Sequence, residues 1–193
     1  MLPGTRKENQ MIDLNNYLTS NLYYLKGDFK GLEARAKSCN DTLDQIASAL
    51  YESFLKKGFT QKQKDNLAPF CREFFYCLDM ESNQFWISKF CELWNVTDDK
   101  DTLLSIIFHS EKGAEIFNNL TPVERVKYSG PWIRPMIKLS NTELFPRFAL
   151  LQIWKSTPKE AKKALYDKII NTLNSFNADY SVCLSELVKD QDF

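Results

Sequence analysis

The chain has 193 residues, of which 44% are hydrophobic and 13% aromatic, with only six glycines and seven prolines. This composition is typical of a packed globular protein and excludes a linker-like or low-complexity chain. The 25 basic and 25 acidic side chains balance, which argues against a general nucleic-acid binder because phosphate neutralisation requires surplus lysine and arginine. No apolar run could span a bilayer and no signal-peptide pattern is present, so we expect a soluble, cytoplasmic protein.

Charge is distributed unevenly along the sequence. Residues 76–124 carry nine acidic and three basic side chains, a net charge of −6, whereas residues 125–168 carry ten basic and three acidic ones, a net charge of +7. Two interpretations stay open. In the first, the two segments are solvated helix faces or face one another. In the second, they steer a charged partner towards the protein.

Helical periodicity dominates the first third of the chain. Apolar residues recur every three or four positions over residues 11–25 and again over residues 32–54. This spacing predicts two helices, each with one apolar stripe, and the second extends for more than six turns. The link between them, KGDFKG, is short enough to predict an antiparallel helical hairpin.

Helix starts are marked by capping boxes, in which a serine or threonine is followed three residues later by glutamate or glutamine. Four pairs have this spacing: Thr60 with Gln63, Thr121 with Glu124, Ser140 with Glu143, and Thr157 with Glu160. No stretch alternates like a strand. We therefore predict an all-α fold, a compact bundle of about eight to ten helices. The chain is expected to be a single domain. The alternative is two subdomains, 1–129 and 140–193, joined by a rigid connector.

The most unusual stretch is aromatic and runs from Phe70 to Trp94. Over residues 70–78 the apolar side chains surround the predicted helix, leaving Arg72, Glu73 and Tyr76 for water. A helix that is apolar on all sides is buried on all sides, which predicts a central helix sheathed by the others. Coverage by another protein or by an apolar ligand is the alternative. Pro69 is expected to begin this helix or to kink it.

The stretch SGPWIRPMIKL, residues 129–139, interrupts the helical pattern. Gly130 suits the end of a helix, and Pro131 and Pro135 prevent its continuation until Ser140 starts the next one. The sequence therefore predicts a rigid, extended connector. Its Trp132 either plugs the core at a corner or serves as an anchor for a partner, since tryptophan and arginine are enriched at binding hot spots.

Few residues indicate chemistry. The only histidine, His109, lies beside an apolar stripe without a metal-ligand or catalytic pattern around it, so a structural role is favoured over a catalytic one. The five cysteines form no C-x-x-C pair, and neither a metal nor a cofactor is expected. Phosphate loops and nucleophile elbows are absent in their known forms. The carboxylates of Asp98 to Asp101 are expected to stabilise a helix start.

These observations favour a protein without enzymatic activity that acts as an interaction module, such as an adaptor, a chaperone-like protein or an accessory subunit. The partner is expected to be a protein with an acidic surface, and self-association stays open. A small-molecule binder or enzyme with an aromatic pocket around residues 70–109 is the alternative. A second alternative is nucleic-acid binding through the basic segment 147–168, with Trp154 as a stacking ring. The predicted partner-binding residues are Trp132, Arg134, Met136, Lys159, Lys162 and Lys163.

Overall fold

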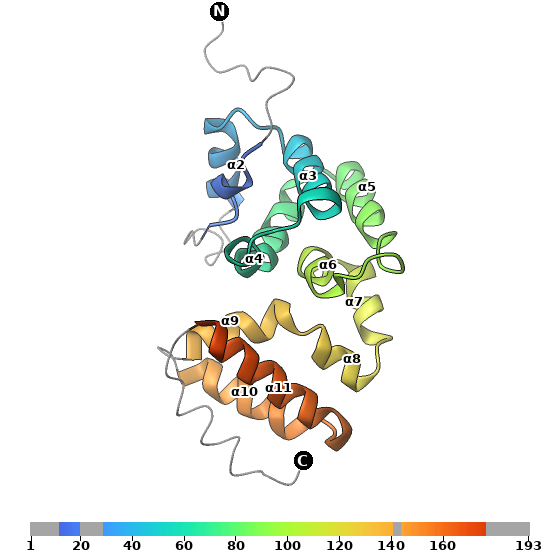
Figure 1. The fold of residues 1–193 in the computed structure, drawn as a ribbon. Coiled ribbons are helices and arrows are strands. Elements are labelled where there is room, and N and C mark those ends of the chain that lie inside the picture. Colours follow the sequence, from blue (N-terminus) through green and yellow to red (C-terminus); the bar gives the residue numbers. More distant parts are fainter. Residues whose placement is uncertain (1–11, 20–28, 141–143, 177–193) are drawn as a thin grey trace, which may run out of the picture. The chain divides into compact units, whose positions relative to one another are not determined.

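A computed structural model describes residues 12–19, 29–140 and 144–176, which contain helices and no strand (Figure 1). The prediction of an all-α fold is therefore confirmed. The chain divides into two compact units, Met1–Ala114 and Glu115–Phe193. The stretch 129–140 lies inside the second unit. The expectation of a single domain stays a prediction.

The first unit contains most of the helices. After a short 3-10 helix, η1 (Leu14–Asn16), come α2 (Phe29–Ser38), α3 (Leu43–Glu52), the π-helical η2 (Ser53–Lys57), α4 (Gln61–Cys77), α5 (Met80–Cys91) and α6 (Lys100–Ile107). Helix α7 (Glu111–Asn118) begins in this unit.

The extents predicted for the first two helices, residues 11–25 and 32–54, are wrong. Residues 12–19 form only η1, and residues 20–28 lie outside the described part. Here the chain bonds to distant side chains instead of continuing as a helix. The hydroxyl of buried Tyr17 donates to the carboxylate of Asp41, and the amide of Asn66 donates to the carbonyl of Leu18.

The long helix predicted over residues 32–54 is in fact two helices, α2 and α3. Asn40 adopts a left-handed backbone with φ of 56°, and the amides of Asn40 and Asp41 donate to the carbonyls of Lys37 and Ala36. This is a Schellman motif, which terminates α2. Thr42 then begins α3 with a complete capping box to Gln45. The apolar stripe continues through the break, which explains why periodicity alone does not reveal it.

Helix α4 forms the centre of the first unit, packed against α2 and α6. It begins at the predicted capping box of Thr60 and contains Pro69 in its interior. Its buried aromatic and apolar side chains are Leu67, Phe70, Cys71, Phe74 and Phe75.

The prediction that three side chains of α4 reach water is correct for two of them. Arg72 is exposed and Tyr76 is 69% exposed, but Glu73 is buried. The carboxylate of Glu73 accepts a hydrogen bond from Nε of Arg72 at 3.3 Å, while its other oxygen has no partner among the described residues. The charge of the buried carboxylate is thus paired with a guanidinium that stays exposed at the surface.

The starts of α5 and α6 follow simple capping rules. Asp79 accepts the amide of Ser82, and Asp99 accepts the amide of Thr102. The helix-stabilising role expected for the carboxylates at residues 98–101 is therefore present at Asp99.

The second unit is built from α8 (Pro122–Lys127), α9 (Gly130–Ser140), α10 (Leu144–Ser156) and α11 (Lys159–Phe176) (Figure 1). Helix α9 packs against α10 and α11, and α11 packs against α8. Thr121 caps α8 as predicted, accepting the amide of Glu124. The capping box predicted for Ser140 and Glu143 is not tested, because Glu143 lies outside the described residues. The core consists of Ile133, Ile137, Leu150, Trp154, Leu165, Ile169 and Leu173.

The extended connector predicted for residues 129–140 is wrong, because this stretch forms the helix α9. Gly130 opens a helix instead of closing one, and Pro131 lies in the first turn, where its missing N–H is not needed. Pro135 removes one helical hydrogen bond. Ile133 and Ile137 lie one turn apart and are both 1% exposed. Their burial favours the helix over the extended form.

Candidate functional site

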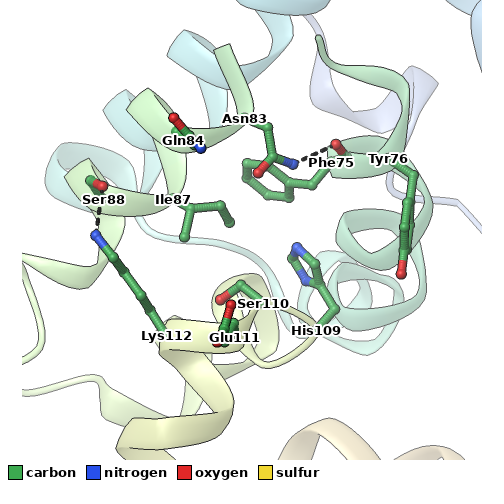
Figure 2. A pocket seen from close by; sticks show the side chains of 10 residues that line it. All are labelled: Phe75, Tyr76, Asn83, Gln84, Ile87, Ser88, His109, Ser110, Glu111 and Lys112. Atoms are coloured by element: carbon green, nitrogen blue, oxygen red, sulfur yellow. Dashed lines mark hydrogen bonds between the residues drawn. The ribbon is translucent and has the colours of Figure 1, made fainter. Parts of the chain in front are cut away.

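The first unit contains an open pocket of about 590 Å³ (Figure 2). Its walls come from the end of α4, from one face of α5, from the turn between α6 and α7, and from the first turn of α7. The lining residues are Phe75, Tyr76, Asn83, Gln84, Ile87, Ser88, His109, Ser110, Glu111 and Lys112.

The α4 and α5 walls are held together by a helix-end hydrogen bond. The Nδ2 atom of Asn83 donates to the backbone carbonyl of Phe75 at 2.7 Å (Figure 2). That carbonyl lies in the last turn of α4, where it has no partner within the helix. Oδ1 of Asn83 has no partner among the described residues. Helical spacing of three and four residues places the four lining residues of α5 on one face: Asn83, Gln84, Ile87 and Ser88.

The opposite wall depends on a close approach between two helices. Oγ of Ser110 donates to the carbonyl of Ile107 at 2.6 Å and accepts the amide of Gly113 at 3.0 Å. A Cβ atom on Gly113 would lie 1.9 Å from the oxygen of Ile107. Glycine at this position therefore allows the start of α7 to pack against the end of α6.

His109 lies in the turn between α6 and α7, and its ring stacks on Phe75 with centroids 5.0 Å apart and planes at 22° (Figure 2). Burial, together with the positive charge of Arg72, lowers the pKa of His109 to about 4. The imidazole is thus neutral at pH 7, with one donor and one acceptor nitrogen. Its Nε2 atom is enclosed and has no hydrogen-bond partner among the described residues.

The rim of the pocket is polar and carries both signs of charge. Nζ of Lys112 donates to Oγ of Ser88 at 2.8 Å, so that this lysine reaches across to α5 (Figure 2). Glu111 and Gln84 are exposed, and no interaction ties either side chain to the described part of the chain. Tyr76 presents a largely exposed ring on the remaining side.

The thiols near this region are poor nucleophiles. Burial raises the pKa of Cys71, and burial together with the charges of Glu33 and Glu73 raises the pKa of Cys77 to about 11. Both thiols are therefore protonated at neutral pH, whereas a thiolate is the reactive form. The pocket thus offers hydrogen-bonding groups and aromatic surface in place of an activated cysteine.

The predicted partner-binding residues lie in the second unit, on α9 and α11. Arg134 donates to Oγ of Ser175 at 2.8 Å, and half-buried Met136 packs against the core. Only the backbone of Trp132 is described. Nζ of Lys162 lies 5.3 Å from the ring centroid of Trp154.

The two remaining lysines of the predicted surface, Lys159 and Lys163, lie one turn apart on α11 and are exposed. Nζ of Lys163 lies 3.9 Å from the carboxylate of Asp167. Trp154 is only 2% exposed, so the stacking role expected for its ring is wrong. The partner surface on α9 and α11 stays a prediction.

The pocket overlaps the region around residues 70–109 that the sequence indicated as an alternative site, and extends beyond it to Ser110, Glu111 and Lys112. Phe75, Tyr76 and His109 are the lining residues that the sequence analysis singled out, Phe75 as part of the segment 70–78. The polar residues of α5 and the first turn of α7 were missed. Their only sequence signal is the i, i+4 spacing of Gln84 and Ser88, which does not reveal that they face His109.

A second group of aromatic side chains surrounds Lys89, whose Nζ lies 4.7 Å from the ring centroid of Tyr51 and 5.4 Å from those of Phe85 and Trp86. The indole of Trp86 donates to Asp44 at 3.1 Å. The ammonium of Lys89 thus forms cation–π contacts with all three rings, so this aromatic group already has a cation from the chain itself.

Comparison of the chain with protein-family models, with curated proteins and with solved structures gave no match. In the described part of the chain, no helix combines the length and apolarity needed to cross a bilayer. Within the same residues, no three histidine, cysteine, aspartate or glutamate side chains are grouped so as to hold a metal ion. The described residues thus form an all-α fold with an open, partly aromatic pocket.

Proposed function

We propose that this chain is a protein-interaction module and that its pocket receives a segment of the partner. The observation that carries this proposal is the open pocket of about 590 Å³ with the exposed ring of Tyr76 on its wall. Binding sites commonly have volumes of roughly 300–1,000 Å³ and combine apolar surface with a few polar groups. Aromatic side chains of this kind are enriched at binding hot spots.

The lining suits a peptide segment. Phe75 and Ile87 supply apolar surface for a side chain, while the free carboxamide of Gln84 and the unused Oδ1 of Asn83 can pair with peptide groups. Each peptide unit brings one donor and one acceptor, which matches the groups of a carboxamide. A segment bound here would therefore satisfy its backbone while burying a side chain.

Affinity capture from a native lysate, followed by mass spectrometry, tests this proposal. The wild-type protein is compared with Tyr76→Ser and with Val96→Ser, a control that removes a similarly exposed apolar side chain outside the pocket. We expect a stoichiometric partner whose affinity falls about tenfold, or about 1.4 kcal/mol, in Tyr76→Ser alone. Equal capture by all three proteins would contradict the pocket as the binding site.

A small-molecule binder is the second candidate, favoured by the enclosed, unpaired Nε2 of His109. A ligand placed in the pocket could use this atom, since buried polar atoms are normally hydrogen-bonded. The low-molecular-weight fraction of the same lysate should then raise the melting temperature of the wild-type protein and not that of His109→Phe. Without such a shift this candidate fails.

The surface predicted on α9 and α11, for a partner with an acidic surface, is a separate hypothesis. Its exposed lysines, Lys159 and Lys163, can be replaced together by serine in the same capture experiment. Loss of an acidic partner in this double variant, with the Tyr76-dependent partner retained, would support a second interaction face. Nucleic-acid binding by this segment would instead appear as salt-dependent retention of labelled RNA or DNA.

A further inference from the structure

The pocket leaves four acceptor oxygens unused, and two of them belong to the charged carboxylate of Glu111. Oδ1 of Asn83, the carboxamide oxygen of Gln84 and both carboxylate oxygens of Glu111 have no partner among the described residues. The unused donors are the amide protons of Gln84 and Asn83 and the hydroxyl proton of Ser88, whose oxygen already accepts from Lys112. A ligand that satisfies these four acceptor oxygens, and the charge of Glu111 in particular, must donate hydrogen bonds.

The neighbouring cations are directed to other groups and not to these oxygens. Nζ of Lys112 is directed to Ser88, and Nε of Arg72 is directed to the buried carboxylate of Glu73. Glu111 stays unpaired beside Lys112, although the two residues are adjacent in sequence. The negative charge of Glu111 at the rim is therefore available to a cation from outside.

We propose that the pocket binds an arginine side chain of a partner protein, with the guanidinium between the Tyr76 ring and the Glu111 carboxylate. This inference deepens the proposed function, on which it rests, by naming the chemistry of the partner segment. A guanidinium is planar, carries five N–H donors and no acceptor, and stacks on aromatic faces. Its positive charge matches the carboxylate of Glu111, and its N–H donors match the unused oxygens of Asn83 and Gln84.

Arginine fits this site better than lysine. An ammonium is compact and strongly hydrated, whereas a guanidinium can stack on a ring and donate to a carboxylate and a carboxamide at the same time. Neutral His109 does not repel the bound cation, and Phe75 behind it extends the aromatic surface. The site thus favours a flat, delocalised cation.

Charge along the chain supports a basic partner segment. The pocket lies almost entirely within residues 76–124, whose net charge is −6. Complementary charge raises the association rate and disfavours acidic partners. The partner of this pocket is therefore basic, in contrast to the acidic partner expected for the lysines of α11.

Titration of the isotopically labelled full chain with N-acetyl-arginine amide, followed by NMR, tests this proposal. The matched probe is the citrulline analogue, which keeps the shape but is neutral. We expect the side-chain amide signals of Asn83 and Gln84 and the backbone signals of residues 109–112 to shift with arginine, and citrulline to bind at least about tenfold more weakly. Equal binding of the two probes, or shifts confined to other residues, would overturn the proposal.

Variants with a matched charge change sharpen the test. Glu111→Gln should weaken binding of the arginine probe about tenfold, while Asp98→Asn, an exposed acid of the same segment outside the pocket, should leave it unchanged. An unchanged affinity in Glu111→Gln contradicts the assigned role of this carboxylate.

Two further outcomes would contradict the proposal that the bound guanidinium belongs to a partner protein. Free arginine that binds more tightly than the capped probe indicates a small-molecule site. Pocket signals that change on dilution of the protein alone indicate a second copy of the chain. If Tyr76-dependent capture succeeds while the arginine probe fails, the proposed function stands and only its specificity is wrong.

Discussion

Replacement of Gly113 by alanine tests the geometry on which the pocket depends. In an ordinary helix this change is stabilising by about 1 kcal/mol, because alanine loses less backbone entropy than glycine. Here the added Cβ would lie 1.9 Å from the carbonyl oxygen of Ile107 and 3.0 Å from Oγ of Ser110. The nearer atom belongs to the backbone, so the start of α7 must shift by about 1 Å relative to α6.

The expected sign of the effect is therefore reversed. Overpacking of this kind costs roughly 1–3 kcal/mol, and Gly113→Ala should lower the free energy of unfolding by about that amount despite its better helix propensity. Urea denaturation monitored by circular dichroism measures the change. The displaced wall should also weaken binding of any ligand that contacts both His109 and α5.

Gly58→Ala is the matched control for this prediction. Gly58 has a φ of 68° with no atom within 4 Å of an added Cβ, so alanine is strained there but meets no neighbour. Its expected cost is roughly 1–3 kcal/mol from backbone conformation alone, because a φ of 68° with a ψ of −173° is essentially restricted to glycine, and ligand binding in the pocket should be unchanged. If Gly113→Ala unfolds at the wild-type midpoint or above it, the close approach of α6 and α7 is refuted.

Three further predictions concern His109, Phe74 and Thr42. Because the pKa of His109 is about 4 in the folded protein and ordinarily 6.5, the unfolded state binds its proton first. Stability should therefore fall by up to about 3 kcal/mol as the pH falls from about 6.5 to 4, and His109→Asn should show a smaller pH slope in urea titrations. Phe74→Ala should cost about 3–5 kcal/mol because its ring is fully buried; a midpoint equal to that of exposed Tyr76→Ala would show that it is not core. Thr42→Ala should cost about 1 kcal/mol by loss of the capping box, and an unchanged thermal midpoint would argue against that cap.

Local signals in the sequence were reliable at several helix starts, although Thr157 donates to the carbonyl of Ile153 and does not form the box predicted with Glu160. The complete box at Thr60, the cap that Thr121 provides to the amide of Glu124, and a carboxylate cap within residues 98–101, at Asp99, agree with the predictions, because a side chain reaching an amide two or three residues away needs no tertiary partner. The same reasoning would have found Thr42 with Gln45. The continuous apolar stripe across residues 32–54 concealed it.

Residues 129–140 show how burial can outweigh local preference. Two prolines and a glycine favour an extended connector, but Ile133 and Ile137 reach the second core only when they lie one helical turn apart. The cost of Pro135 inside the helix, about 3 kcal/mol, is offset by the burial of two isoleucine side chains at roughly 1.5–3 kcal/mol each. Sequence alone could not weigh these effects, since the core that receives the isoleucines comes from α10 and α11.

The sequence by itself determined that the fold class is all-α, that residues 70–77 belong to a central helix, and where several helices begin. These properties follow from periodicity and from hydrogen bonds between near neighbours. Only the tertiary structure decided that Glu73 is buried beside Arg72 and that His109 stacks on Phe75 opposite the polar face of α5. The pocket joins residues up to 37 positions apart, from Phe75 to Lys112, and such a meeting depends on how helices pack, which no local pattern encodes.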